Sequence, residues 1–187
     1  THSNNATSID YHFPQNSNGN LGTVSVTTAD GQQKGFSNSF DSRDRQIASS
    51  GSVNRGYQYD PDGNLISISN CNGTSIFSYD EFSNLKRVVT FDGKRIDFAS
   101  DATGRRTKKS INGNVKEFYV WYDSNRLAAV LDQNKNIVIT YSYGPMPTNA
   151  PVQMTKNGKD YHIVTDPMTG SVRYVIDENG TIVQQIS

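Results

Sequence analysis

Asp166 and Asp177 are the two carboxylates whose spacing could bring them together across a hairpin. Paired carboxylates of this kind carry out general acid–base catalysis in hydrolases. Aspartate is also a frequent first residue of a turn, because its side chain hydrogen-bonds the backbone two residues further on. We favour this second interpretation, two turn-capping aspartates.

The stretch Asp60-Pro-Asp-Gly-Asn64 gathers oxygen-bearing side chains and raises the question of a calcium loop. A calcium-binding EF-hand loop needs glycine at its sixth position and glutamate at its twelfth. Here glycine is fourth, and the twelfth position is Cys71. We therefore predict a turn rather than a cation site.

The densest basic run is Gly104-Arg-Arg-Thr-Lys-Lys109. In a strand, Arg105 and Lys109 would lie on one face. A solvated strand face is the favoured interpretation. The alternative is contact of Arg105 and Lys109 with an anionic partner, such as a sugar acid, a lipopolysaccharide phosphate or a nucleic acid. The formal net charge is zero, whereas nucleic-acid-binding proteins are usually basic, so we expect no nucleic-acid partner.

Aromatic residues are densest in Phe118–Tyr122, where Tyr119 and Trp121 would share one strand face. If that face is exposed, these two residues would form a platform for sugar stacking or protein contact, because aromatic side chains with a polar tip favour interfaces. The alternative is a core on both faces. Tyr141 and Tyr143 allow the same two interpretations.

The sequence lacks the motifs of metal sites, serine hydrolases and phosphate-binding loops. His2, His12 and His162 are scattered without metal-ligand spacing, and neither a Gly-x-Ser-x-Gly motif nor a phosphate-binding glycine loop occurs. Cys71 is the only cysteine, which excludes an intrachain disulfide. No run reaches eighteen apolar residues, so we expect no membrane insertion. We predict that the chain is not an enzyme and holds no metal or cofactor.

The composition indicates that these residues are carried by strands and turns. The 187 residues include 13 Ile and 14 Val against 5 Leu, with abundant Asn, Ser and Gly. β-Branched and aromatic residues favour strands, and Asn, Ser and Gly favour turns. No stretch of ten or more residues has helical periodicity, so the fold is predicted to be all-β.

The turns recur at a regular spacing. An aspartate that follows a strand-like segment occurs at positions 41, 60, 80, 101 and 123, at intervals of 19 to 22 residues. The predicted structural turn residues of this repeat are Asp60, Gly63, Asn64, Asp80, Asp101 and Gly104. Between the copies lie Asn72-Gly73, Asp92-Gly93 and Asn112-Gly113, which are strong signals for two-residue hairpins. Each period therefore holds two strands and two turns, and the copies form an antiparallel meander in an extended or curled sheet.

The motif Tyr57-x-Tyr-Asp-x-x-Gly-Asn-Leu65 resembles the YD repeat of the Rhs/teneurin-like family, and the stretches at 79–85 and 98–106 are similar to it. The region from Tyr143 to Val183 resembles the end of the Rhs core, where the family reads Tyr-x-x-x-Asp-His-Leu-Gly-Ser-x-Arg. Here Pro167-Met-Thr169 stands between Asp166 and Gly170, which is one residue longer and lacks the histidine. The resemblance covers residues 36–187.

The resemblance implies a hollow β shell built from many repeats, which in bacterial members often encloses a toxic domain. In teneurin-like members the repeats belong to cell-surface adhesion proteins. Five copies cannot close such a shell, so we expect an excised piece of a longer protein with sheet edges that need covering. The self-cleaving aspartates of some Rhs toxins lie in a motif beyond the matched segment, and no protease residue is carried over.

We predict a surface-exposed or secreted module of a bacterial protein that binds a cell-surface glycan or protein. The alternative is a structural wall segment of an Rhs-type shell that encapsulates a toxin domain. A homo-oligomer, a trimer or similar, is one way to cover the sheet edges. The expected divisions are an N-terminal strand pair or linker over 1–35, the hairpin array over 36–143 and Rhs-core-like hairpins over 144–187, all in one continuous β domain.

Overall fold

A computed structural model describes residues 19–20, 22–27, 33–51, 54–145, 149–166 and 168–186. No helix occurs in this part of the chain, which confirms the predicted all-β class. The strands are β1 (Thr23–Thr27), β2 (Gln33–Phe40), β3 (Gln46–Gly51), β4 (Arg55–Tyr59), β5 (Leu65–Asn70), β6 (Gly73–Tyr79), β7 (Leu85–Val89), β8 (Arg95–Ser100), β9 (Arg106–Ile111), β10 (Asn114–Trp121), β11 (Leu127–Leu131), β12 (Ile137–Ser142), β13 (Gln153–Lys156), β14 (Lys159–Thr165), β15 (Val172–Asp177) and β16 (Ile182–Gln185).

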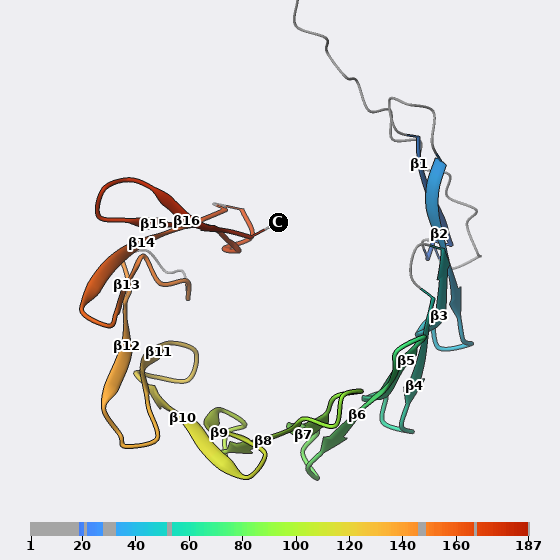
Figure 1. Cartoon of the computed structure of the whole chain (residues 1–187), viewed down its shortest axis with the longest axis horizontal. Helices are drawn as coiled ribbons and strands as arrows, with labels where there is room; N and C mark the ends of the chain where they lie inside the picture. The colour runs from blue at the N-terminus through green and yellow to red at the C-terminus, as the bar shows by residue number, and fades with distance from the viewer. Residues whose placement is uncertain are drawn as a thin grey trace, which may run out of the picture. The chain divides into compact units, whose positions relative to one another are not determined.

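The chain divides into two compact units between Lys94 and Arg95. In the first unit, β1 to β7 each pair antiparallel with the next strand in the chain (Figure 1). In the second unit, β8 to β16 pair in the same manner (Figure 1). The predicted antiparallel meander of hairpins is therefore confirmed in each unit. The predicted divisions of the chain stay predictions, and most of the 1–35 segment lies outside the described residues.

One turn geometry recurs throughout the described chain. In each copy, the backbone N–H of the first residue donates to the carbonyl of the fifth, and the N–H of the fourth donates to the carbonyl of the first. The fourth residue always has a positive φ, between 61° and 93°. This is the three-residue hairpin loop that ends in a left-handed residue and a bulge. The copies are Asp41–Arg45, Asp60–Asn64, Asp80–Asn84, Thr90–Lys94, Asp101–Arg105, Asp132–Asn136 and Asp177–Thr181.

The predicted two-residue hairpins are only partly found. Asn112 and Gly113 do occupy a two-residue turn, with φ values of 50° and 83°, as do Asn157 and Gly158. The prediction was wrong for Asp92-Gly93, which lies inside the five-residue turn Thr90–Lys94. There the Thr90 hydroxyl bonds the Asp92 carboxylate and the Lys94 carbonyl, so threonine takes the position of the first aspartate.

The prediction was also wrong for Asn72-Gly73. Gly73 pairs with Asn70 as the first residue of β6, so that Cys71 and Asn72 are the central residues of the turn. The Asn70 side chain accepts the N–H of Asn72 and thereby stabilises this earlier turn position. The turn therefore lies one residue earlier than the Asn72-Gly73 dipeptide predicted. Glycine tolerates a positive φ, so Gly73 can also begin a strand directly after the turn.

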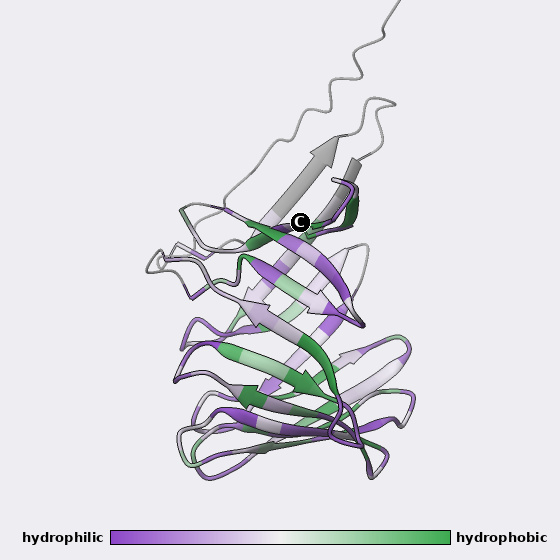
Figure 2. Cartoon of the chain, turned by 90° about the vertical axis from the view of Figure 1, so that its left-hand side faces the viewer, coloured by the Kyte–Doolittle hydropathy of each residue, from purple (hydrophilic) through white to green (hydrophobic). Residues whose placement is uncertain are grey.

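Burial is shallow in both units. The buried hydrophobic residues of the described chain are Ala129, Val130 and Val175, and no side chain there is fully enclosed. Figure 2 shows hydrophobic and hydrophilic residues mixed along strands of the second unit. Within each unit the described strands form one layer, without a helix or second sheet to cover either face. Each face is therefore covered only by its own side chains.

Candidate functional site

The carboxylate at the first position of the recurring turn acts as a clamp. In the Asp101 turn, one carboxylate oxygen accepts the N–H groups of Thr103 and Arg105 at 2.9 and 3.0 Å and the Thr103 hydroxyl at 2.7 Å. The other oxygen accepts Nε of Arg105 at 2.8 Å. Hydrogen bonds from Thr103 and Arg105 hold the pKa of Asp101 well below its usual range.

The clamp is repeated with small changes of partner. Asp60 and Asp80 each accept the backbone N–H of an asparagine four residues on, at 2.8 Å, and also its side-chain amide. Asp132 does the same with Asn136. All the predicted structural turn residues therefore lie in these turns, with Gly63 and Gly104 at the left-handed fourth position.

Successive clamps are also linked to one another within each unit. In the first unit, Arg45 donates to the carbonyl of Asp60 at 3.2 Å, and the Asn64 amide donates to the Ser83 hydroxyl at 3.1 Å. In the second unit, Arg105 donates to the carbonyl of Asp123 at 3.1 Å. Arg105, predicted as a candidate ligand residue, is thus already bonded to two turns. We refer to these bonded turns as the turn ladder.

Four aromatic residues at the end of a strand, or just after it, each bond a distant backbone carbonyl. The donor is a Tyr hydroxyl or the Trp121 indole N–H. The acceptor is the backbone carbonyl of a residue that begins an earlier strand. Each pair lies beside a register shift, where a bulge leaves a backbone group outside the strand ladder. The pairs are Tyr59 with Gln46, Tyr79 with Leu65, Trp121 with Arg106 and Tyr143 with Leu127, at 2.8 to 2.9 Å.

The remaining candidate ligand residues lie on β9, β10 and β12, with Tyr143 directly after β12. Lys109 donates to both carboxylate oxygens of Glu117 at 3.2 and 3.3 Å, and the Tyr119 hydroxyl bonds the same carboxylate. Burial, and then the bond to Glu117, raises the pKa of Tyr119. Burial also raises the pKa of Tyr141. The structure therefore gathers Lys109 and Tyr119 into one polar cluster, while the polar tips of Trp121 and Tyr143 bond the backbone.

The structure separates the carboxylates of Asp166 and Asp177. Asp166 precedes β15 and accepts the N–H groups of Met168 and Thr169 at 2.9 Å. Asp177 ends the same strand and accepts the N–H of Thr181 at 2.8 Å. A six-residue strand of roughly 3.3 Å per residue lies between them. Two turn-closing aspartates are therefore observed.

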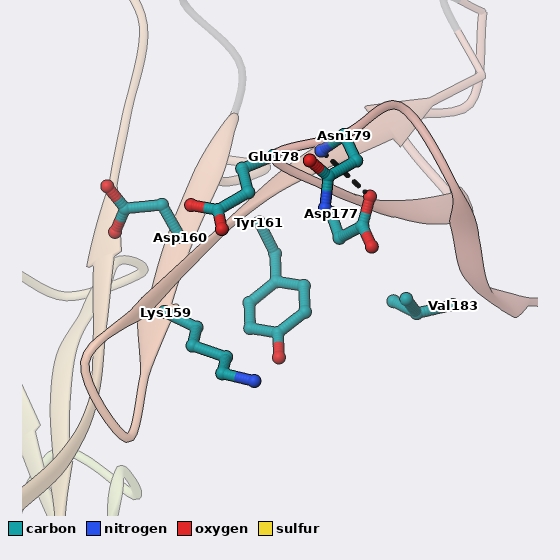
Figure 3. Close-up of a pocket in the computed structure, with 7 residues that line it drawn as sticks. All are labelled: Lys159, Asp160, Tyr161, Asp177, Glu178, Asn179 and Val183. Carbon is teal, nitrogen blue, oxygen red and sulfur yellow. Dashed lines mark hydrogen bonds between the residues drawn. The ribbon is translucent and has the colours of Figure 1, made fainter.

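A small cavity lies where the β13–β14 hairpin meets the turn after β15. Its volume is about 220 Å³, and Figure 3 shows the residues that line it, which are Lys159, Asp160, Tyr161, Asp177, Glu178, Asn179 and Val183. Strand register places these segments together, since Tyr161 is the cross-strand partner of Asp177. The sequence alone does not reveal this site, because its lining comes from two hairpins. Only the register of β14 on β15 joins them.

The described residues contain no group of three or more His, Cys, Asp and Glu side chains that could hold a metal ion. His162 is an exposed residue of β14, and His2 and His12 lie outside the described residues. Over that same part of the chain, no helix is long and apolar enough to cross a membrane.

A family model described as the teneurin YD-shell matches residues 3–187. Among curated proteins, the tRNA3(Ser)-specific nuclease WapA of Bacillus spizizenii is 31% identical in an alignment of 147 residues, which covers 76% of this chain and 6% of that protein. The solved structures include the Photorhabdus luminescens Tc holotoxin pore, with 12% identity and a TM-score of 0.42 over 92% of this chain. A crystal structure of TcdB2–TccC3 has 13% identity and a TM-score of 0.45 over 90% of this chain. In both structures the match spans 12% of the other chain.

Proposed function

Because the chain belongs to the teneurin YD-shell family, we propose that it is a wall segment of a YD-repeat shell that encloses a toxin domain. The observation that carries this proposal is the turn ladder. Its carboxylates, guanidinium groups and amides bond their own turn and the next one, as in Arg45 with Asp60 and Arg105 with Asp123. Side chains used in this manner fasten repeat to repeat, which is what a wall of one layer requires.

The shallow burial supports the same role. A sheet of one layer leaves apolar side chains on both faces, such as Phe36, Ile76 and Val120, which are 41 to 51% exposed. A self-contained module would be expected to bury such groups in a core. In a shell, neighbouring repeats and the enclosed polypeptide would cover them instead.

The proposal gives the chain a structural role rather than a catalytic one. The aspartates that a hydrolase would use as free carboxylates are held by backbone N–H groups in turns. The curated relative is a bacterial nuclease of which this chain matches 6%. A bacterial secreted or surface protein, with its activity in another domain, fits this relationship.

Light scattering after size exclusion tests the wall segment. In the described chain β16 pairs on one side only, with β15, and an open strand edge associates with other strands. We expect the mass of the 187-residue chain to rise with concentration, and Ile182→Lys in β16 to reduce this association. The matched control is Val120→Lys, which adds the same charge to an exposed position of a strand paired on both sides.

A monomer or trimer whose mass does not change on dilution would contradict the wall segment and support a self-contained binding module. If Val120→Lys abolishes the association and Ile182→Lys does not, the contact lies on a sheet face. That result would also contradict continuation of the wall through β16.

Binding of a cell-surface partner is the second candidate function. Phe82, Tyr122 and Met168 lie at turns and are 72 to 95% exposed, although the turn ladder does not need an apolar side chain at these positions. Large exposed apolar side chains at loop tips suit contact with a partner protein. Replacing each by Ser should weaken attachment to cells without changing the mass measured by light scattering.

A further inference from the structure

The cavity at Tyr161 combines an aromatic ring with polar groups of several kinds. In Figure 3 the Tyr161 ring lies between the Lys159 side chain and Val183, and the carboxylates of Glu178 and Asp177 lie toward the main-chain end of the Tyr161 side chain. The lining comes from the start of β14, the end of β15 and the beginning of β16. The backbone of these adjacent segments places the lining, in which Tyr161 and Asp177 are half-buried and the other five side chains are exposed.

Some of the charged groups around the cavity are already occupied. Asp160 accepts the Thr155 hydroxyl at 2.6 Å, and Asp177 accepts the N–H groups of Asn179 and Thr181. By contrast, the Lys159 ammonium and the Glu178 carboxylate make no hydrogen bond or ion pair with any part of the chain that the structure describes. The cavity therefore presents one available cation and one available anion, at opposite ends of the Tyr161 side chain (Figure 3).

This combination selects for hydroxyl groups. An ammonium group only donates hydrogen bonds and a carboxylate only accepts them, whereas a hydroxyl does both. Separate hydroxyls of one ligand can therefore satisfy Lys159 and Glu178, and the Asn179 amide can take either role. An anionic ligand would be repelled by the carboxylates of Glu178, Asp160 and Asp177, which outnumber the single Lys159 ammonium in the lining.

We propose that this cavity binds a neutral saccharide ring, seated against the Tyr161 ring with its hydroxyls on Lys159 and Glu178. The volume of about 220 Å³ is below the roughly 300 Å³ at which sites for drug-sized ligands begin. One sugar residue, as at the end or along the surface of a glycan, suits this size. The site is independent of the turn ladder and of the shell proposal.

Ligand-observed NMR and titration calorimetry on the 187-residue chain test the site. The probes are the methyl glycosides of glucose, galactose, mannose and N-acetylglucosamine, with methyl glucuronide and glucosamine as anionic and cationic comparators. We expect at least one neutral glycoside to bind with a Kd in the range of about 1 mM, as is usual for a shallow contact. Lys159→Gln and Glu178→Gln should each weaken it about tenfold.

The matched controls are Lys116→Gln and Glu81→Gln, which remove the same charges from exposed positions outside the cavity and should leave binding unchanged. Absence of binding by every neutral glycoside to the folded chain would overturn the proposal. So would binding that both cavity variants leave intact, or tighter binding of glucosamine or glucuronide than of any neutral probe. These readouts are separate from the mass measurement, so failure of one proposal does not imply failure of the other.

Discussion

Asp60 and Asp62 stand two positions apart in one turn, yet only the first has a structural task. Asp60 accepts the N–H and the side-chain amide of Asn64, while the structure gives the Asp62 side chain no bond within the described residues. We expect Asp60→Ala to lower Tm by about 2–4 °C, since the N–H of Asn64 loses its acceptor. Asp62→Ala is the control and should leave Tm unchanged. Calorimetry on both variants checks this, and equal effects would contradict the clamp.

The clamps also predict how stability depends on pH. Hydrogen bonds within the turns lower the pKa values of Asp60, Asp80 and Asp101. A lowered folded-state pKa stabilises the folded state fully above the unfolded value of about 3.9, and this contribution is lost as the pH falls through the folded-state value. The urea midpoint should therefore be level between about pH 5 and 7 and decline below about pH 4.

Replacing the aspartate isolates the clamp contribution to that decline. Asp101→Asn cannot titrate, so its urea midpoint should fall less steeply below about pH 4 than that of the parent chain. The Asp62→Asn variant is a control for the loss of one carboxylate and should follow the parent curve. A midpoint that stays level down to about pH 2.5 in the parent chain would contradict the pKa directions.

The sequence predicted where most of these turns lie, but it did not show what closes them. Aspartate spacing identified the Asp60, Asp80 and Asp101 turns because an aspartate after a strand is a local signal. The turn at Asp132–Asn136 was missed because Asp132 follows Asp123 by nine residues, outside the spacing of 19 to 22 that identified the other turns. The carbonyl acceptors of Arg45 and Arg105 lie 15 and 18 residues away, and only the register of the strands brings them near.

At the scale of the strand, Tyr143 and Tyr122 offer a matched comparison. Both rings contact the Arg126 guanidinium, at 5.7 and 5.0 Å, but only the Tyr143 hydroxyl donates to a backbone carbonyl, that of Leu127. Tyr143→Phe should reduce the free energy of unfolding by about 0.5–1.5 kcal/mol, because the Leu127 carbonyl beside the bulge loses its donor. Tyr122→Phe should change it by less than about 0.5 kcal/mol. Chemical denaturation measures both, and equal losses would show that the hydroxyl bond is not what stabilises the bulge.

The same strands show which part of the aromatic platform could be predicted. Alternation alone indicated that Tyr119 and Trp121 share a face. It could not show that Trp121 donates to the Arg106 carbonyl or that Tyr119 bonds Glu117, because those partners depend on the register of β9 and β10. A sequence pattern gives the direction of a side chain, whereas the partner at its tip is a tertiary property.

At the scale of the whole chain, composition predicted strands and turns but not the way in which they would be covered. The 14 Val and 13 Ile indicated strands, but they did not show that the buried apolar residues of the described chain would be Ala129, Val130 and Val175. The same alternation of apolar residues fits two kinds of sheet. One is covered on one face within its own chain, and the other is covered only within a larger assembly. The fold class could therefore be predicted from the sequence, and the choice between a binding module and a wall segment could not.

Shallow burial predicts an unusual response to denaturant. The urea m-value scales with the surface exposed on unfolding, and typical small proteins give about 1–3 kcal/mol/M. Because each unit is a single layer without a fully enclosed side chain in its described part, the isolated chain exposes less new surface on unfolding than a compact protein of 187 residues. We expect its m-value, measured at concentrations too low for association, to fall clearly below that of compact proteins of equal length.

At higher concentration the m-value should increase, since association through β16 buries surface that unfolding then exposes, and Ile182→Lys should remove this increase. An m-value equal to that of compact proteins, at every concentration, would mean that the sheet is covered within one chain and would contradict the wall.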